Sequence, residues 1–548
     1  MNLTKGDSMS EQKYQADVVI VGGGLAGLTA AYDLISNGKK VILLDRDDKE
    51  HLGGLAKKSF GGVMFVDSPH QRRMGLKDNP ALAWEDWKSF ADFEDSDELP
   101  KQWAKLYVEK SIPYIYEWLD HKKIQFLPVV NWAERGIFRP GNSVPRWHIT
   151  WGTGYELIVK ILKAIESHPK RNLLQIYYNH KVDNLIIESN TAIGVSGLDE
   201  VSKSNFTVKA ETVILASGGI CGGDLSEVRK NWFSDWGKAP NVLLNGSHKY
   251  ADGMLHRVAE KKGAKLTNLD KQWHYAAGIF HPNPTQKDDG LSLVPPRSAI
   301  WVDSSGKRFG PLPLMGYTDT RYAVEQITKS KAQYSWQIMN WKIAIKELAV
   351  SGSDYMTAFR NKSKIKLIKD ILFGNTELVN RLIKESKDIV VANTIPELVG
   401  KMNEISLSGF KVDEEILTNE IRTYDSMIDR GKSYYNDDQL RRIANFRNYR
   451  GDRIRTCNFQ KIEDKKALPL IAIREFILSR KSLGGIQTNL QSQVLDSKGK
   501  TISGLYAIGE TAGFGGGGIH GKGSLEGTFL GSCVLTARVA VESIVGKK

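Results

Sequence analysis

The stretch VIVGGGLAGLTAAYDLISNGKKVILLD, residues 19–45, decides the fold of this 548-residue chain. Three of its glycines, Gly22, Gly24 and Gly27, lie between an apolar run and a second, longer apolar pattern. This spacing is typical of the turn that brings backbone against the diphosphate of a dinucleotide. The first glycine permits the tight turn, the second the close approach of the diphosphate, and the third close packing of helix on strand.

The residues around this turn predict a complete βαβ unit. Apolar patterning predicts a buried strand over 17–21, a helix over 25–37 that ends at Gly38, and a parallel strand over 40–44. Asp45 closes the second strand, where a carboxylate accepts hydrogen bonds from the adenosine ribose and repels a 2′-phosphate. The unit therefore favours FAD or NAD over NADP. A lone glycine turn without such flanks would be a much weaker signal.

The length of the chain predicts two domains or more. The first residues are polar, and no run approaches the roughly 18 apolar residues of a membrane span. We therefore predict a flexible leader over 1–16 and a soluble, cytoplasmic protein. The cysteines Cys221, Cys457 and Cys533 are scattered, so we expect neither a disulfide framework nor a metal site, and a reducing compartment.

The formal net charge is +13, and arginines are locally concentrated in one short segment. Its arginines are Arg441, Arg442, Arg447, Arg450, Arg453 and Arg455. Such a run is usually a solvated helix face, and acids are interspersed here. An anionic substrate, a lipid surface or an acidic partner is the alternative. Because no nucleic-acid-binding motif accompanies the charge, nucleic acid is not an expected partner.

The character of the sequence changes twice along the chain. Strand-rich sequence runs over 173–208, and residues 213–219 predict a buried strand that enters a glycine turn and returns to the cofactor sheet. Prolines and helix-forming polar sequence then follow, before glycines and strands resume. We predict an α/β fold whose parts are a discontinuous Rossmann-like domain, 17–279 and 466–548, and an inserted α+β capping domain, 280–465.

Further motifs follow in order along nearly the whole chain. They are Leu52–Ala56, Ala216–Gly219, Gly306–Phe309, Leu483–Ile486 and the block GLYAIGETAGFGGGGIHGKGSLEGTFLGS at 504–532. Together with the first turn they resemble the flavoprotein superfamily of fumarate reductase and 3-ketosteroid Δ1-dehydrogenase. Within it, SVPRWHITWGTG at 143–154 and SLGGIQTNL at 482–490 resemble a bacterial branch of FAD-binding dehydrogenases.

The resemblance implies a noncovalently bound FAD and a capping domain that closes over its isoalloxazine ring. Gly22, Gly24 and Gly27 would hold the diphosphate, and Asp45 the ribose. Glu510 would contact the ribityl side. The backbone amides of Ser524 and Leu525 would reach the pyrimidine edge, where a helix N-terminus stabilises the negative charge of reduced flavin. The other expected cofactor contacts are Leu25, Ala26, Arg46, Gly53, Gly54, Leu55, Ala56, Val182, Ala216, Ser217, Gly218 and Gly509.

Enzymes of this superfamily move a hydride between flavin N5 and a carbon near an activating carbonyl, while a protein group transfers a proton. Gly316 stands where the reductases carry an acid arginine and the steroid enzymes a tyrosine; a local shift would make the adjacent Tyr317 the base. Ser524 stands where the reductases bind a substrate carboxylate through arginine. Both departures count against reduction of a dicarboxylate, and we expect instead a ketosteroid-like dehydrogenation of a bulky apolar substrate.

Other polar residues are candidates for the same site. His274 resembles a substrate-contacting histidine of the reductases, although a histidine among aromatics often only packs. Lys481 lies near the turn that polarises the keto oxygen in the steroid enzymes. His520 lies in the glycine block, where it would support reduced-flavin charge or only hydrogen-bond its loop. Arg146 and His148 resemble a segment near the substrate cavity, with a salt bridge that anchors the loop as the alternative.

The sequence therefore predicts an FAD-dependent oxidoreductase acting on CH–CH groups, most simply a ketosteroid-like dehydrogenase. Two alternatives stay open: an ene-reductase of a small unsaturated acid, and an FAD-binding protein without turnover. The sequence has no haem motif, no iron–sulfur cysteine pattern and no second nucleotide motif. We therefore expect an external electron acceptor or donor besides the small-molecule substrate.

Overall fold

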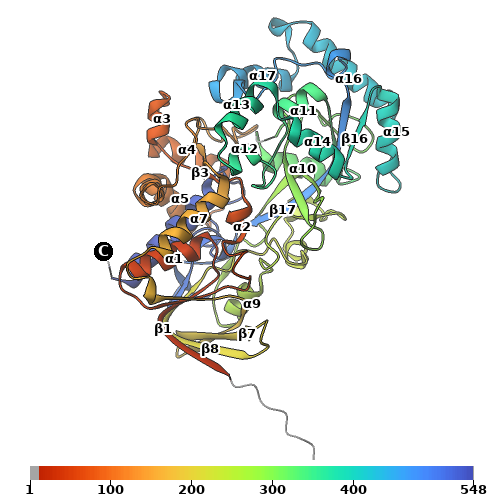
Figure 1. Ribbon diagram of the computed structural model, residues 1–548. Coiled ribbons are helices and arrows are strands. Elements are labelled where there is room, and N and C mark those ends of the chain that lie inside the picture. Colours follow the sequence, from red (N-terminus) through yellow and green to blue (C-terminus); the bar gives the residue numbers. More distant parts are fainter. Residues whose placement is uncertain (1–10, 317, 547–548) are drawn as a thin grey trace, which may run out of the picture.

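Two eight-stranded sheets organise the computed structural model, which describes residues 11–316 and 318–546 (Figure 1). The first sheet contains β1 (Gln12–Val21), β2 (Val41–Leu44), β5 (Leu174–Tyr177), β6 (His180–Glu188), β7 (Thr191–Asp199), β8 (Asn205–Leu215), β19 (Gln493–Leu495) and β20 (Thr501–Ala507). Their order is β19-β20-β7-β8-β1-β2-β5, with β6 paired to β7. The strands β5, β2, β1, β8 and β20 pair in parallel and form the centre of the sheet.

The predicted βαβ unit is present at the centre of this sheet. β1 pairs in parallel with β2, Val19 opposite Ile42, and α1 (Leu25–Ser36) connects them. The inner face of α1 buries Leu28, Leu34 and Ile35 completely. Each such side chain contributes roughly 1.5–3 kcal/mol to stability.

The predicted leader is too long at its C-terminal end. β1 begins at Gln12, which pairs with Phe206 of β8, whereas the leader was expected to reach residue 16. Residues 12–16 alternate between partly buried and exposed positions until Ala16. A strand with one solvated face has a polar sequence, so composition alone did not reveal it. Residues 1–10 lie outside the described part of the chain.

The second sheet is almost entirely antiparallel. It contains β9 (Leu244–Asn245), β11 (Gln272–Phe280), β12 (Gly290–Val294), β13 (Ile300–Val302), β14 (Tyr334–Asn340), β15 (Ala349–Val350), β16 (Ile389–Ala392) and β17 (Leu470–Ser482). The order is β13-β14-β17-β11-β12-β15, and β16 and β9 also pair with β17. β17 is 13 residues long and buried along almost its whole length. It is the central strand of this sheet.

This sheet extends past both ends of the predicted insertion, 280–465. β11 and β17 lie almost wholly in segments that the sequence prediction assigned to the cofactor domain. Both strands are buried apolar runs, and such runs look alike in either sheet. Only their hydrogen-bonded partners distinguish the two sheets, and the partners are remote in sequence.

Helices surround both sheets. They are α2 (Gly54–Lys58), α3 (Pro69–Arg73), α4 (Pro80–Ala91), α5 (Glu98–Lys110), α6 (Glu117–His121), α7 (Thr153–Glu166), α8 (Ser226–Lys230), α9 (Met254–Lys261), α10 (Thr320–Lys329), α11 (Trp341–Glu347), α12 (Thr357–Arg360), α13 (Lys364–Phe373), α14 (Thr376–Glu385), α15 (Ile395–Ile405), α16 (Glu414–Asp429), α17 (Asp438–Asn448), α18 (Arg450–Arg453) and α19 (Thr528–Ile544). Two short ladders, β3 (Gly62–Met64) with β4 (Trp147–Ile149) and β10 (Leu266–Thr267) with β18 (Gly485–Ile486), complete the fold.

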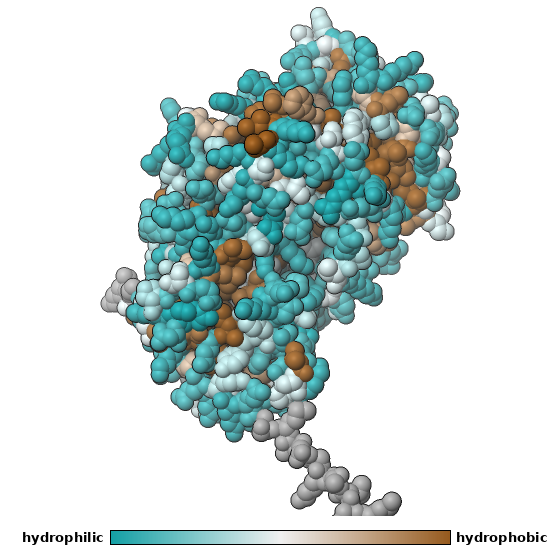
Figure 2. Space-filling view, viewed as in Figure 1, coloured by the Kyte–Doolittle hydropathy of each residue, from teal (hydrophilic) through white to brown (hydrophobic). Residues whose placement is uncertain are grey.

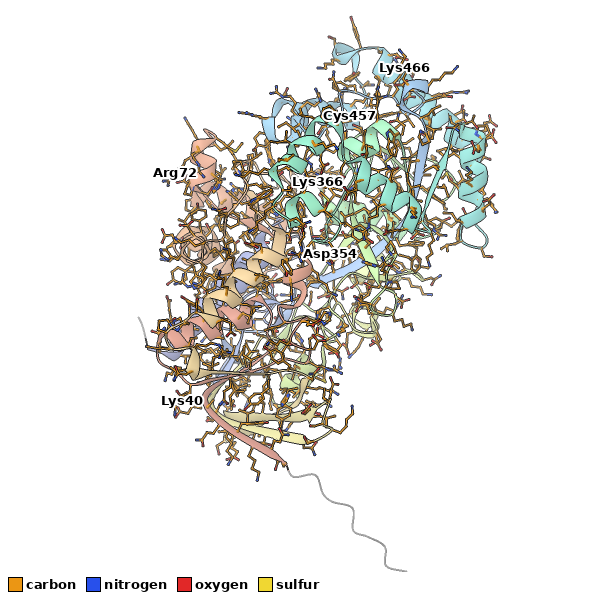
Figure 3. All side chains as sticks on the ribbon, in the orientation of Figure 1. Lys40, Arg72, Asp354, Lys366, Cys457 and Lys466 are labelled. Atoms are coloured by element: carbon orange, nitrogen blue, oxygen red, sulfur yellow. The ribbon has the colours of Figure 1, made fainter. Side chains whose placement is uncertain are left out.

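The two sheets lie toward opposite ends of the molecule. α1 and α7 lie over the first sheet, whereas α11, α14, α15 and α16 gather at the other end (Figure 1). Lys40 marks the first end and Cys457 the second among the side chains of Figure 3. Within residues 11–316 and 318–546, none of the helices combines the length and the apolar character that crossing a membrane requires.

Candidate active site

The turn after β1 has the shape that its glycines predict. Gly22 has a φ of 110°, and a Cβ on it would lie 2.3 Å from the carbonyl oxygen of Ala216. A Cβ on Gly27 would lie 1.9 Å from the carbonyl oxygen of Gly22. A Cβ on Gly24, in contrast, would meet no atom of the described residues within 4 Å. The first and third glycines therefore permit packing, and the second leaves open space beside the backbone.

This open space lies at the N-terminus of α1. Gly24 is the N-cap, and the first helical hydrogen bond runs from the amide of Leu28 to the carbonyl of Gly24. The amides of Leu25 and Ala26 therefore have no acceptor within the helix. Gly24 also bridges to Gly53, which has a φ of 118°. Two glycine backbones and a free helix N-terminus fit the diphosphate of a dinucleotide.

Asp45 and Arg46 lie beside this turn. The Asp45 carboxylate accepts hydrogen bonds from the backbone amides of Gly23 at 2.5 Å and Asp47 at 2.7 Å. Burial raises the pKa of Asp45, and these two amides oppose the shift. Arg46 pairs with Glu200 at 2.8 Å. In the structure Asp45 thus also fixes the glycine turn itself.

A large cavity runs from this turn to the ends of β11 and β17. Its empty volume is about 1620 Å³, open solvent at the mouth included. The predicted cofactor residues that line it are Gly22, Gly24, Leu25, Ala26, Asp45, Arg46, Gly53, Gly54, Leu55, Ala56, Val182, Ala216, Ser217, Gly218 and Glu510. Gly27, Gly509, Ser524 and Leu525 lie outside this lining. We call this space the cofactor cavity.

Glu510 is a buried acid in the wall of the cofactor cavity. Its carboxylate accepts a hydrogen bond from the Ser482 amide at 3.0 Å. Burial raises the pKa of Glu510 to about 7, and the Ser482 amide and Lys481 oppose the shift. A carboxyl group that is half protonated near neutral pH can donate as well as accept a hydrogen bond. This suits contact with ligand hydroxyls.

Tyr275, Lys481 and Glu526 form a hydrogen-bonded group at the far end of the cavity, and all three line it. The Tyr275 hydroxyl donates to Glu526 Oε1 at 2.9 Å, and Lys481 Nζ donates to the Tyr275 oxygen at 3.1 Å. The Lys481 ammonium also lies 3.9 Å from the centre of the Phe529 ring. A phenol between a cation and a carboxylate is suited to proton transfer.

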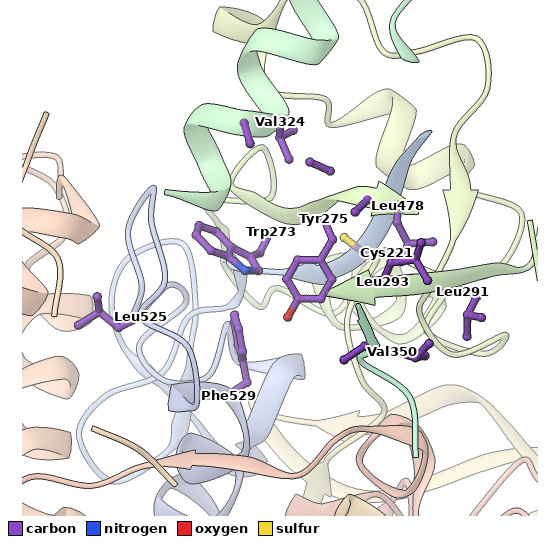
Figure 4. Close-up of a cluster of buried hydrophobic side chains, with 14 of the residues drawn as sticks. Cys221, Trp273, Tyr275, Leu291, Leu293, Val324, Val350, Leu478, Leu525 and Phe529 are labelled. Atoms are coloured by element: carbon purple, nitrogen blue, oxygen red, sulfur yellow. The ribbon is translucent and has the colours of Figure 1, made fainter. Parts of the chain in front are cut away.

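The sheet and the glycine block bring these three residues together. Trp273 of β11 pairs with Lys481 of β17, and a register irregularity follows between Trp273 and Tyr275. Trp273 and Tyr275 project from the same side of β11 toward the segment that carries Phe529 (Figure 4). That segment supplies Glu526, which accepts from both the Trp273 indole at 3.4 Å and Tyr275.

Burial and nearby charge set the protonation of this group. Burial lowers the pKa of Lys481 to about 8, and Glu526 opposes this shift. Glu134 is fully buried nearby, and burial together with the charge of Glu526 raises its pKa well above the ordinary value. Lys481 is therefore still mostly protonated at neutral pH, and burial favours the uncharged form of Glu134.

His274, in contrast, faces away from the cavity. Successive side chains of a strand point to opposite faces, so His274 lies on the other side of β11 from its neighbour Tyr275. Its Nε2 lies 2.9 Å from Gln272 Oε1, and its ring stacks on Trp232. Burial lowers its pKa to about 3, so the imidazole is neutral. His274 does not line the cofactor cavity. Its contacts agree with the alternative that this histidine only packs among aromatic residues.

His520 also lies outside the cavity lining. Its ring stacks on Trp87, and its Nε2 lies 2.9 Å from the Thr528 hydroxyl. Burial lowers the pKa of His520 well below the ordinary value. The contacts of this histidine hold the glycine block. Tyr317 lies outside the described residues, and its neighbour Gly316 lines a different pocket.

Arg146 and His148 make contacts that stabilise the local structure. Arg146 is fully buried and pairs with Asp78 at 2.9 Å and with Asp86 at 2.5 Å. His148 Nε2 lies 2.7 Å from the Ser68 hydroxyl. The contacts of Arg146 therefore agree with the alternative role, a salt bridge that anchors the loop before β4.

A second pocket adjoins the cofactor cavity. The two share Phe60, Trp147 and Ser351 in their linings. The second pocket has an empty volume of about 1220 Å³, and its walls come from β12 and β15 of the second sheet, from β4 and from the helices α11 to α13. Apolar lining atoms predominate, as in pockets for apolar ligands. We call it the outer pocket.

Sequence reasoning did not find Tyr275, Glu526 or Arg480. His274 resembles a substrate-contacting histidine of the reductases, and that resemblance favoured it over its neighbour Tyr275. Glu526 is an acidic residue in the glycine block, and its presence there could have indicated a polar site. Arg480 lines the cavity, and its Nε has no partner among the described residues.

The sequence matches the FAD binding domain family over residues 17–530. The chain belongs to this family. FAD is therefore its cofactor, as predicted, and the protein is an FAD-dependent oxidoreductase. The glycine turn and the N-terminus of α1 fit a diphosphate, and we propose that the cofactor cavity holds this FAD.

Curated relatives support the same superfamily. The chain is 40% identical over 544 residues to a KsdD-like steroid dehydrogenase of Mycobacterium tuberculosis, covering 96% of this chain and 95% of the relative. It is 39% identical to a KsdD-like steroid dehydrogenase of Mycolicibacterium smegmatis over 94% of this chain and 96% of the relative. It is 24% identical to fumarate reductase 1 of Saccharomyces cerevisiae, over 97% of this chain and 99% of the relative.

Solved structures share the fold. The 3-ketosteroid Δ1-dehydrogenase of Sterolibacterium denitrificans aligns with a TM-score of 0.68 and 17% identity, covering 97% of this chain and 100% of that chain. A flavocytochrome c3 fumarate reductase aligns with a TM-score of 0.68 and 19% identity, over 97% of this chain and 78% of that chain. The predicted Rossmann-like fold with a capping domain is confirmed.

Proposed function

We propose that this oxidoreductase desaturates a carbon–carbon bond next to a carbonyl in a bulky apolar substrate of the steroid class. The names of the relatives at 40% identity support the substrate class. The outer pocket, whose lining is mainly apolar and which shares three lining residues with the cofactor cavity, provides space for such a substrate. The observation that carries the proposal is the group Tyr275–Lys481–Glu526 in the wall of the cofactor cavity.

Desaturation removes a hydride and a proton from adjacent carbons. When bound, FAD supplies the hydride acceptor at its N5 atom, and an external acceptor later takes the two electrons. Tyr275 accepts the proton at its phenol oxygen while its own hydroxyl proton passes to Glu526 Oε1, 2.9 Å away. The Lys481 ammonium, 3.1 Å from that oxygen, stabilises its negative charge during the transfer.

The cavity also supplies positive charge for the substrate carbonyl. Arg480 and Lys481 are adjacent on β17, and both line the cofactor cavity. A cation beside a keto oxygen stabilises the enolate-like charge that develops there when the neighbouring carbon loses its proton. Glu510, Gly53 and Gly54 would hold FAD in this arrangement.

The direct test is anaerobic bleaching of the bound flavin. FAD-loaded protein is mixed with a panel of 3-ketosteroids that includes 4-androstene-3,17-dione, the ligand in a solved ketosteroid dehydrogenase of the same fold. We expect rapid loss of flavin absorbance and a desaturated product detected by mass spectrometry. Absence of bleaching with every member of the panel would refute the proposed substrate class.

An ene-reductase of a small unsaturated acid is the second candidate. Arg480 favours it, because its partly unpaired guanidinium in the cavity wall matches a carboxylate. Chemically reduced protein would then be reoxidised by enoates and not by enones that lack a carboxylate. A protein that binds FAD but supports neither reaction would correspond to the non-catalytic alternative.

A further inference from the structure

Helix α13 presents an apolar face to solvent. Ile365 is 84% exposed, Leu372 68% and Phe373 71%. None of the helix residues 364–373, all of which the structure describes, is buried. Ile365 and Leu372 lie seven residues apart with Ile368 between them, so they share one side of the helix. Figure 2 shows an apolar patch on the upper part of the molecule, where α13 lies in Figure 1.

Positive charges flank this apolar face. Lys364 and Lys369 are exposed, and Lys366 pairs with Glu377 at 2.6 Å and Asp370 at 3.8 Å. Lys366 therefore pairs with both acidic residues of this region, Asp370 and Glu377. Lys364 and Lys369 extend into solvent. Alternating lysines and large aliphatic residues are typical of helices that lie in the interface of an anionic bilayer.

The arginine-rich segment supplies a second basic rim beside α13. Leu367 and Ile371 of α13 line the outer pocket together with Ile454, which follows α18. Arg450 and Arg453 of α18 are exposed next to Ile454, which is itself 38% exposed. Other arginines of the segment have internal partners: Arg447, for example, donates to the Thr456 carbonyl at 2.6 Å.

We propose that α13 and residues 450–454 dock onto the surface of an anionic lipid bilayer. In α13, exposed aliphatic side chains lie beside the exposed Lys364 and Lys369. In residues 450–454, the exposed Ile454 lies beside the exposed Arg450 and Arg453, and the whole chain carries a net charge of +13. Apolar side chains enter the acyl boundary, and the lysines and arginines contact anionic headgroups. Leu367 and Ile371 of α13 line the outer pocket together with Ile454, so an apolar ligand dissolved in the bilayer has a short route to it.

Vesicle cosedimentation of the FAD-loaded protein tests this surface. We expect the protein to bind vesicles that contain phosphatidylglycerol, to bind phosphatidylcholine vesicles far more weakly, and to dissociate as salt is added. The triple variant Ile365→Ser, Leu372→Ser, Phe373→Ser should lose binding by at least about tenfold. The variant Lys364→Gln, Lys369→Gln should weaken binding to the anionic vesicles by on the order of tenfold.

The control is Val201→Ser, which removes a side chain that is 71% exposed between β7 and β8 of the first sheet. It should bind vesicles like the unchanged protein, and all variants should retain FAD absorbance. Sedimentation velocity separates a lipid surface from an interface between two copies of the chain. Equal binding of the control and the triple variant, or loss of self-association without loss of vesicle binding, would overturn the proposal. Vesicle binding requires no turnover, so its result is independent of the proposed reaction.

Discussion

Side chains from three separate parts of the chain meet at Tyr275. It lies on β11, its cationic partner Lys481 lies on β17, and its acceptor Glu526 lies in the loop before α19. The hydroxyl is held from both sides inside a largely apolar wall. In such surroundings hydrogen bonds to charged groups are stronger than in water, so the phenol oxygen is oriented before a substrate arrives.

Replacing Tyr275 by Phe should lower kcat by about 10²–10⁴ because the proton acceptor is lost. FAD binding should persist, since Tyr275 lies at the end of the cavity remote from the glycine turn. Flavin absorbance and the rate of anaerobic bleaching measure the two effects separately. The control is Tyr334→Phe: this tyrosine is fully buried in the same sheet, and its hydroxyl has no partner among the described residues. A variant Tyr275→Phe with unchanged kcat would remove the tyrosine from the mechanism.

The protonation of Lys481 predicts a pH dependence. Burial lowers its pKa to about 8 in the folded protein, so activity that needs the ammonium should decline as pH rises through about 8. Arginine stays charged, so in Lys481→Arg this alkaline decline should disappear, even if the rate is lower overall. The profile of kcat against pH measures both. The same alkaline limb in the variant would assign the decline to another group.

The same shift affects stability with a defined sign. The ordinary pKa of lysine is 10.5, so between about 8 and 10.5 the unfolded chain binds more protons at this position than the folded one. The contribution of Lys481 to the free energy of unfolding therefore increases with pH through that window.

At the scale of elements, the junction between β1 and α1 determines cofactor binding. Three glycines serve different purposes there: Gly22 lets the turn pass Ala216, Gly27 lets α1 approach the turn, and Gly24 leaves room for the diphosphate. The glycine spacing itself lies within one βαβ unit, so local sequence indicates the junction, although Ala216 reaches it from the end of β8.

Gly27→Ala should greatly reduce FAD binding, because its Cβ would lie 1.9 Å from the carbonyl oxygen of Gly22 and displace the turn. The FAD content of the purified variant and its dissociation constant measure the effect. Gly400→Ala in α15 is the matched control, since a Cβ there meets no described atom within 4 Å. It should stabilise the protein by roughly 0.5–1 kcal/mol and leave FAD binding unchanged. Equal FAD content in both variants would contradict this account of the junction.

At the scale of the whole molecule, the cofactor cavity joins the two sheets. Its lining includes residues of β1 and β2 in the first sheet and of β11 and β17 in the second. A ligand that fills it contacts both sheets, and binding to the native state alone stabilises that state.

Removal of FAD should therefore lower the melting temperature of the whole protein. At free FAD about 100 times above its Kd, binding adds about 2.7 kcal/mol to the free energy of unfolding. Scanning calorimetry of apoprotein with increasing FAD should show the transition move upward, whereas Gly27→Ala should show little movement at the same concentrations. A melting temperature that is independent of FAD in the unchanged protein would contradict this coupling.

The sequence by itself determined the cofactor and its βαβ unit, because that binding site depends on backbone shape over a short stretch of chain. It could not determine the sheet to which β11 and β17 belong, nor whether His274 or Tyr275 faces the flavin cavity. Side chains alternate along a strand, so that choice depends on the pairing of β11 with β17 and on the irregularity after Trp273. Glu526 meets Tyr275 only after the glycine block has folded against the second sheet. The tertiary structure alone decided the chemistry at the end of the cavity, since its groups come from segments that are distant in sequence.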